Sequence, residues 1–278
     1  MSTSNLIERI LASGTRSFSG IVSAIALVLM STPVSATLVL PVGAQTFTTT
    51  GAGADAGLKA SASFWTSGSQ LMVNLANVSS ADITDPGQIL QAVYWDMASS
   101  VSLSLASAIA DQKCTFTGGG ASTCVSNAIP TVGNGNNGSQ TANYKYDSNT
   151  PATPVGSRGI GSAGLGNFGG TDGMDWGILS AGDNLSTYNG GMVNGSPFAK
   201  NSVTFKMDMY KNGTNYTPSH GVGDLSINNI LFNYGTSTHL LNSGLVPPTS
   251  LPEPATLCLF PLAFGFMLKS LRNRRKAD

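Results

Sequence analysis

Glutamate is almost absent from this chain, and its absence constrains the fold more than any other sequence feature. The only glutamates are Glu8 and Glu253, so every acidic residue between positions 37 and 251 is an aspartate. Glutamate favours helices, whereas Asp, Asn, Gly, Ser and Thr favour turns and strand ends. The composition between 37 and 251 therefore disfavours a helical domain and indicates strands joined by polar loops.

Alternation of apolar and polar side chains, the pattern of a half-buried strand, recurs in this part of the chain. Residues 58–64 and 71–75 alternate on either side of Ser67-Gly68-Ser69, which predicts a β-hairpin. Further strands are predicted at 89–95, 101–105, 203–209 and 225–234. In the last of them the phase of the alternation changes at Asn228-Asn229, which predicts a bulge or a bend.

Residues 37–244 are numerous enough for one sizeable core. The segments 130–143 and 151–173 are too long for simple turns, and long loops on a β scaffold often hold binding residues. No fixed-period repeat is present, which disfavours a solenoid or a propeller. We therefore predict an all-β domain, a single antiparallel β-sandwich of jelly-roll type with long Gly/Asn-rich loops.

The charge of this part of the chain excludes one class of partner. Seven Lys and Arg residues stand against eleven aspartates between 37 and 251, which gives a net charge of −4. We expect no nucleic-acid partner for such a domain, because binding to phosphates requires a basic surface. A neutral, hydroxyl-rich surface is compatible with an extracellular polysaccharide, and it is also typical of inert secreted β domains.

The N-terminus has the layout of a signal peptide. Arg9 and Arg16 precede an apolar run at 21–30, and Val34-Ser35-Ala36 places small residues where a signal peptidase reads them. We expect a signal peptide at 1–36, with passage through the Sec translocon and cleavage after Ala36. The alternative is an anchoring helix, but a run of ten residues falls well short of the roughly 20 that span a bilayer.

The C-terminus has three parts in a fixed order. Pro252-Glu253-Pro254 follows a Pro-rich linker at 245–251, an apolar stretch covers 255–271, and a basic end covers 269–276. As a helix the 17 residues of the apolar stretch would span about 25 Å, which is marginal for a bilayer core of roughly 30 Å. The basic end should stay in the cytoplasm, which places the chain before Pro252 outside.

This tail, residues 252–278, resembles the PEP-CTERM sorting signal of exported Gram-negative proteins, which is also catalogued as the ice-binding protein C-terminal motif. The resemblance implies recognition by the membrane enzyme exosortase and cleavage near the Pro-Glu-Pro triplet. Delivery would then proceed from an inner-membrane intermediate to the cell surface or the extracellular matrix. The residues so implied are Pro252, Glu253 and Pro254 as substrate residues, and Arg272, Arg274 and Arg275 in the basic end.

Two observations limit what this resemblance says. An ordinary C-terminal anchor helix would need only the apolar and basic parts, and it leaves Pro252-Glu253-Pro254 unexplained. A sorting tail indicates where a protein goes and not what its exported domain binds. Four stretches of that domain also resemble a subgroup of PEP-CTERM surface proteins that has no established activity, namely 85–90, 175–184, 200–205 and 232–236.

Cys114 and Cys124 are the only cysteines between 37 and 251. In an oxidising compartment a disulfide is the default for such a pair. A metal site is less favoured, since no histidine or second C-x-x-C lies near either cysteine. Cys258 lies within the apolar tail and is expected to be an apolar filler or an acylation site.

The sequence gives little support for catalysis. His220 and His239 are the only histidines, and no G-x-S-x-G motif is present. A glycosidase needs two carboxylates, and although aspartates can serve, the absence of any glutamate from this domain disfavours a glycosidase. Residues 159–164 fit G-x-G-x-x-G, but they follow a Pro-rich loop and open no helix, so we interpret them as a flexible loop and expect no cofactor.

Two groups of residues remain as weak candidates for binding. Oxygen ligands for Ca²⁺ could come from Asp172, Asp175 and Asp183, although aspartates that cap turns beside glycines explain the same pattern. Sugar rings could stack on Tyr144, Tyr146 and Tyr188, which lie in polar surroundings. Trp95 and Trp176 have strand-like surroundings and are expected in the core.

These observations favour a non-catalytic surface or matrix protein that exosortase sorts. The first alternative is a carbohydrate-binding module that acts on extracellular polysaccharide. The second alternative is a secreted hydrolase.

Overall fold

A computed structural model describes residues 38–80, 82–98, 100–117, 121–135, 142–148, 157–162, 175–186, 197–235 and 239–243. Contacts divide the chain into two compact units, 1–40 and 41–278, and every described strand belongs to the second unit. These strands form one mixed, mostly antiparallel sheet, which confirms the all-β prediction.

The strands are β1 (Gln45–Thr50), β2 (Lys59–Ser67), β3 (Gln70–Asn77), β4 (Leu90–Asp96), β5 (Ser102–Thr117), β6 (Ala121–Ala128), β7 (Val132–Asn134), β8 (Tyr144–Asp147), β9 (Arg158–Ser162), β10 (Ile178–Leu179), β11 (Phe198–Lys211), β12 (Thr214–Asn215), β13 (Asn228–Tyr234) and β14 (His239–Asn242). Short 3₁₀ helices lie at η1 (Gly53–Asp55), η2 (Pro86–Gln88) and η4 (Gly221–Leu225).

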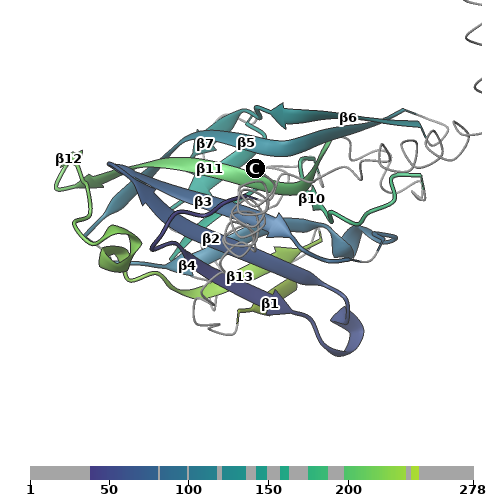
Figure 1. The fold of residues 1–278 in the computed structure, drawn as a ribbon, viewed down its shortest axis with the longest axis horizontal. Coiled ribbons are helices and arrows are strands. Elements are labelled where there is room, and N and C mark those ends of the chain that lie inside the picture. The colour runs from purple at the N-terminus through teal and green to yellow at the C-terminus, as the bar shows by residue number, and fades with distance from the viewer. Residues whose placement is uncertain are drawn as a thin grey trace, which may run out of the picture. The chain divides into compact units, whose positions relative to one another are not determined.

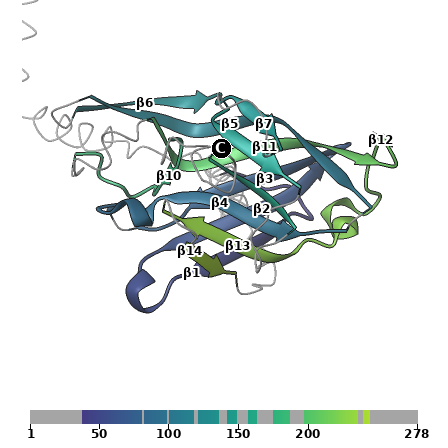
Figure 2. The same ribbon diagram turned by 180° about the vertical axis from the view of Figure 1, so that it is seen from behind.

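The sheet has two halves, one arranged around β11 and the other around β4, which Figures 1 and 2 show from opposite sides. Around β11 the strands run in the order β1-β2-β3-β11-β5-β6. Around β4 they run in the order β14-β13-β4-β9-β8-β7. The short strand β10 pairs with both β11 and β4 and so links the halves.

The main core lies between these two halves. The ring of Phe64 in β2 lies 5.6 Å from that of Trp95 in β4, and the ring of Tyr144 in β8 lies 5.0 Å from that of Phe205 in β11. All four side chains are fully buried. Burial stabilises a fold by roughly 1.5–3 kcal/mol for each large apolar side chain, so these pairs hold the halves face to face in a sandwich-like arrangement.

Side-chain hydrogen bonds join the borders of the two halves. The Thr49 hydroxyl of β1 donates to the carbonyl oxygen of Asn242 in β14, at 2.7 Å. On the opposite border, the Asn134 side chain of β7 forms two hydrogen bonds with the backbone of Leu105 in β5. Both contacts link strands that do not pair with each other in the sheet.

The predicted hairpin and the predicted bulge are both confirmed. Strands β2 and β3 pair up to Ser67 and Gln70, and Gly68 of the turn has a φ of 60°, which glycine adopts without strain. The pairing of β13 with β4 shifts register between Asn228 and Leu231, next to the left-handed Asn229. Residue 225, predicted as part of this strand, instead ends the 3₁₀ helix η4.

The sheet differs from the purely antiparallel prediction in two places. Strand β10 runs parallel to β11, and β7 runs parallel to β8. These strands have only two and three residues, too few for alternation to reveal their direction.

The prediction of a flexible loop at 159–164 is wrong for residues 159–162. Gly159, Ile160, Gly161 and Ser162 belong to β9, which pairs with β4 on one side and β8 on the other. Glycine weakens a strand in isolation, but here a fully buried Ile160 and two neighbouring strands outweigh that preference. Strand β7 likewise lies within the predicted loop 130–143.

Candidate functional site

Several predicted site residues lie outside the described residues. They are Ala36, Asp172, Tyr188, Pro252, Glu253, Pro254, Arg272, Arg274 and Arg275. Within the described residues, no helix combines the length and the apolar character needed to cross a membrane. Their roles in processing, sorting and binding stay predictions.

The structure corrects the prediction that Tyr144 and Tyr146 offer exposed faces to a sugar. Both lie in β8 and point into the core, with 0% and 2% of their surface exposed. The Tyr144 hydroxyl donates to the Trp176 carbonyl oxygen, and that of Tyr146 accepts from Arg158. Burial raises the pKa of Tyr144 well above its usual value and is also the main reason for the raised pKa of Tyr146. The β8 strand buries these rings because its alternation places residues 144 and 146 on the inner face.

Trp95 and Trp176 lie in the core, as predicted, with 0% and 5% of their surface exposed. The Trp176 ring meets the ring of Tyr144 edge to face, with 6.2 Å between their centres. The ammonium group of Lys113 lies 5.5 Å from the centre of the same indole. Neither tryptophan offers a flat exposed surface on which a sugar ring could stack.

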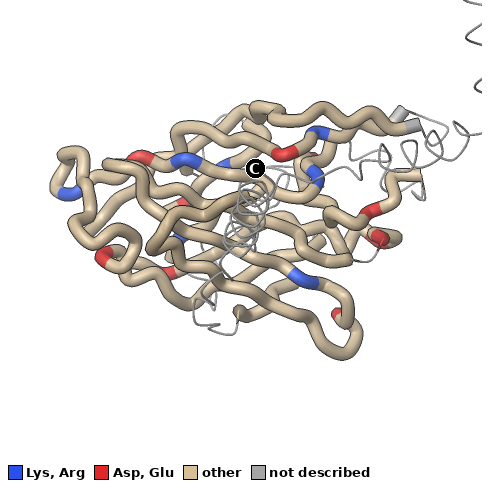
Figure 3. The backbone as a smooth tube through the Cα atoms, viewed as in Figure 1, with Lys and Arg blue, Asp and Glu red and all other residues tan. Residues whose placement is uncertain are grey.

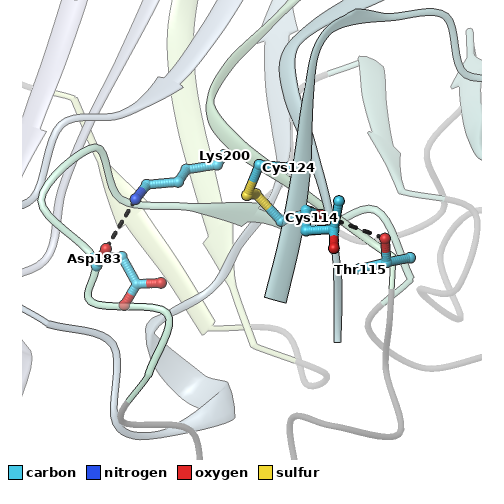
Figure 4. The surroundings of a disulfide bond; sticks show 6 residues. Cys114, Thr115, Cys124, Asp183 and Lys200 are labelled. Atoms are coloured by element: carbon cyan, nitrogen blue, oxygen red, sulfur yellow. Dashed lines mark hydrogen bonds between the residues drawn. A yellow bond between two sulfur atoms is a disulfide. The ribbon is translucent and has the colours of Figure 1, made fainter. Parts of the chain in front are cut away.

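The Ca²⁺ candidate Asp183 has a structural role in the described part of the chain. It is 4% exposed, and its carboxylate accepts a hydrogen bond from the Ile83 backbone N–H at 2.9 Å. Its carbonyl oxygen accepts from the Lys200 ammonium at 2.8 Å, as Figure 4 shows. Within the described residues, no three His, Cys, Asp or Glu side chains are grouped so that they could hold a metal ion. Asp183 therefore fastens the segment before η2 to β11.

The predicted disulfide between Cys114 and Cys124 is present. It joins β5 to β6 across directly paired positions, with 4.1 Å between the two Cα atoms (Figure 4). Cys114 is fully buried, whereas Cys124 is exposed. Beside it, the Thr115 hydroxyl donates to the carbonyl oxygen of Thr123, so that the same two strands are fastened again one pair further along.

A pocket of about 260 Å³ is the best candidate for a binding site. It is built from η1 and the turn that follows it, from the segment between β3 and β4, and from the start of β14. Its polar lining residues are Asp55, Ser79, Asp82, Asp85, Gln88 and His239. Three carboxylates and one imidazole thus line a cavity that has no Lys or Arg among its lining residues.

Local hydrogen bonds fix most of these side chains. Asp85 accepts from the Gly87 N–H and forms a capping box with Gln88 that starts η2. The carboxylate of Asp82 accepts from the Asn184 N–H at 2.9 Å. Nε2 of His239 lies 2.9 Å from Oδ1 of Asp55, and both side chains are partly exposed, so solvent reaches the pair.

The chemistry of this pocket suits recognition of hydroxyl or amino groups. Carboxylates accept hydrogen bonds from such donors, and a histidine can accept or donate. The Asp55–His239 pair resembles the base and orienting acid of a hydrolase. However, the Ser79 hydroxyl is bonded to the backbone of Lys59, so it is not positioned as a nucleophile for that histidine.

This pocket was not predicted from the sequence. Asp55 and His239 are 184 positions apart, and only the approach of β14 to β1 brings them together. One local signal was available, because Asp85-Pro86-Gly87-Gln88 has the pattern of a capped helical turn. That signal predicts a fixed turn and gives no information about the opposite wall of the pocket.

In the described residues the geometry defines an all-β domain with a cross-strand disulfide and a small acidic pocket. No protein-family model, curated protein or solved structure matches this chain.

Proposed function

We propose that this chain is a non-catalytic exported protein that exosortase sorts to the cell surface or the extracellular matrix of a Gram-negative bacterium. The observation that supports export best is the disulfide between Cys114 and Cys124. Disulfides persist in oxidising compartments and are rare in the cytosol. Its presence on a β scaffold agrees with the signal peptide and the sorting tail expected at the two ends of the sequence.

We further propose that the two facing halves form a β-sandwich related to the jelly roll. The packing of Phe64 against Trp95 and of Tyr144 against Phe205 across the core supports this proposal. Such a scaffold would present its loops and borders outside the cell while the tail determines the location.

Intact-mass analysis tests the sorting. Protein recovered from the surface and medium of producing cells should begin at Thr37 and end near Pro252, and it should keep its tail in a strain without exosortase. Replacing Pro252, Glu253 and Pro254 by alanine should also preserve the tail. A matched control replaces Pro247 and Pro248 of the linker by alanine. This variant should be processed normally. A full-length tail in both strains would show instead a simple membrane anchor.

The second candidate function is polysaccharide binding at the acidic pocket. The specific observation is the partly exposed Asp55–His239 pair among hydrogen-bond acceptors. Retention of the protein on the producer's own polysaccharide should fall in Asp55→Asn and His239→Ala. Asp208→Asn in β11, outside the pocket, is the control and should not change retention. Equal retention of all three variants would exclude this pocket as the binding site.

A hydrolase remains the least favoured function. A hydrolase would have to turn over glycans or peptides, and a single substitution in the pocket would have to abolish that turnover. The variant to assay is His239→Ala.

A further inference from the structure

The chain contains five Asn-Gly pairs, and two of them lie in the described residues. These two are Asn134-Gly135, at the end of β7, and Asn212-Gly213, between β11 and β12. The pairs that begin at positions 137, 189 and 194 lie outside the described residues. Asparagine before glycine is chemically labile, because the next backbone nitrogen can attack the side-chain carbonyl carbon and glycine has no Cβ to hinder it.

Asn212 and Gly213 form the two-residue turn between β11 and β12, next to the pair of Lys211 with Thr214. Their φ angles of 53° and 78° are both positive, as in the type I′ turn that Asn-Gly favours. Both residues are exposed, and Figures 1 and 2 both show β12 at one end of the sheet. Strand β12 has only two residues, and both are exposed. The tip of this hairpin can therefore open locally while the core stays folded.

The groups that would react at this turn are not engaged elsewhere. Within the described part of the chain, the Asn212 amide forms no hydrogen bond, and the Gly213 N–H donates to no carbonyl oxygen. A Cβ atom at Gly213 would meet nothing within 4 Å, so the amide has room to approach the backbone nitrogen. The Thr214 hydroxyl donates to the Lys211 carbonyl oxygen at 2.9 Å, a contact that involves neither reacting group.

The pair Asn134-Gly135 shows the opposite arrangement. Gly135 also has a positive φ, 77°, and a Cβ atom there would also meet nothing within 4 Å. However, the Gly135 N–H donates to the Tyr146 carbonyl oxygen at 2.8 Å. The Asn134 amide forms its two hydrogen bonds with the Leu105 backbone. Three hydrogen bonds therefore restrain the reacting groups at Asn134, and none restrains those at Asn212.

We propose that Asn212 is a site of spontaneous deamidation. The Gly213 nitrogen attacks the side-chain carbonyl carbon of Asn212 and forms a C–N bond, which closes a succinimide ring. The side-chain nitrogen leaves as ammonia and takes with it the proton lost by the Gly213 nitrogen. Water then adds to one of the ring carbonyls and breaks the bond from that carbon to the Gly213 nitrogen, which regains a proton. Addition at the side-chain carbonyl yields aspartate, and addition at the backbone carbonyl yields isoaspartate.

The products would change the turn in two ways. Either product puts a carboxylate in place of a neutral amide, next to Lys211 in the sequence. Charged residues are few along the described backbone, as Figure 3 shows, so the added charge changes its surroundings markedly. Isoaspartate also carries the main chain through its side-chain carbon, which lengthens the turn and disturbs the pairing of Lys211 with Thr214. The rest of the sheet should persist, because β12 pairs only with β11 in the described residues.

Peptide mapping by mass spectrometry tests the proposal on the full chain, purified in detergent and kept in mildly alkaline buffer. Asn212 should deamidate more than about tenfold faster than Asn134, because three hydrogen bonds must open before Asn134 reacts. The peptide that contains Asn212 should also acquire isoaspartate, which an isoaspartyl methyltransferase detects. Both products should form more slowly in mildly acidic buffer, because the attacking nitrogen must lose a proton.

Two controls separate the structure from the sequence motif. In guanidinium chloride the hydrogen bonds are lost, so Asn134 and Asn212 should deamidate at similar rates. Asn212→Gln keeps a neutral amide on a longer side chain that forms no succinimide, so this peptide should stay free of isoaspartate. The proposal is overturned if Asn212 stays intact in the folded chain or deamidates no faster there than Asn134. An equally large difference in guanidinium chloride would also overturn it, because the cause would then be the neighbours in sequence.

Discussion

The side-chain amide of Asn134 in β7 forms two hydrogen bonds with the backbone of Leu105 in β5. Its oxygen accepts from the Leu105 N–H at 2.6 Å, and its nitrogen donates to the Leu105 carbonyl oxygen at 3.1 Å. A side chain thus takes the place of a neighbouring strand at this border. The contact connects the two halves of the sheet where no backbone ladder joins them.

Removing this amide should therefore weaken the border. Asn134→Ala is expected to lower the free energy of unfolding by about 1–3 kcal/mol, because it leaves both Leu105 backbone groups without their partner. Urea unfolding measures the change. Asn134→Asp keeps an oxygen that accepts from the Leu105 N–H but loses the donor to the Leu105 carbonyl oxygen. Its loss of unfolding free energy should therefore be smaller than that of the alanine variant. Equal stability of all three proteins would show that the border does not depend on Asn134.

The disulfide should contribute mainly through the unfolded chain. Replacing both Cys114 and Cys124 by alanine should lower the free energy of unfolding by about 3 kcal/mol. This is the free-energy equivalent of the chain entropy that a loop of this length removes from the unfolded state. Reduction of the unmodified protein should have a similar effect, and reduction of the double variant should have none. Thermal unfolding with and without a reducing agent distinguishes these cases.

Asp96 should make the stability of the fold depend on acid pH. The pKa of its carboxyl is lowered, chiefly by the hydrogen bond from the Asn229 side chain at 2.8 Å and also by the Ser157 N–H. A carboxylate with a lowered pKa in the folded state stabilises fully above its unfolded pKa, about 3.9, and this contribution is lost as the pH falls through the folded pKa. Unfolding midpoints measured between pH 7 and pH 2 should fall over that window.

Two variants test this assignment. Asp96→Asn should be less stable than the unmodified protein at pH 7, and the difference should shrink as the pH falls below about 3.9. Asn229→Ala should remove most of the same pH dependence, because its amide is the largest cause of the shift. An unchanged acid profile in both variants would assign the effect to other carboxylates.

Gly177, which precedes β10, is expected to tolerate no side chain. A Cβ atom there would lie 2.4 Å from Cγ2 of Ile89 and 2.5 Å from Nε2 of Gln91, and both residues are fully buried. Gly177→Ala should therefore cost about 1–3 kcal/mol of stability through overpacking. Gly223→Ala in η4 is the matched control, because a Cβ there meets no atom within 4 Å. Similar melting temperatures for both variants would contradict the packing at Gly177.

Local features of the sequence were enough to predict several elements. The hairpin of β2 and β3, the strands β4 and β11 and the bulge near Asn229 follow from alternation and turn residues, which act over a few neighbouring positions. The disulfide also followed from local information, because Cys114 and Cys124 are ten positions apart and have no rival partner in that part of the chain.

Other elements depend on neighbours that are distant in sequence. The glycines at 159 and 161 are typical of a loop, yet β4 and β8 enclose them on both sides. Polar neighbours make Tyr144 and Tyr146 resemble surface residues, although pairing of β8 turns their rings into the core. A strand of four residues is too short for its sequence pattern to reveal burial, and in the structure all four residues of β8 are buried.

The sequence by itself determined the all-β class, the principal hairpin and the disulfide, because propensity, alternation and a single cysteine pair act locally. Only the tertiary structure decided which strands are neighbours, that β10 and β7 run parallel to their partners, and that Asp55 meets His239 in a pocket. Such features depend on which distant strands pair, and the energy that selects the pairing comes from burial summed over the whole core.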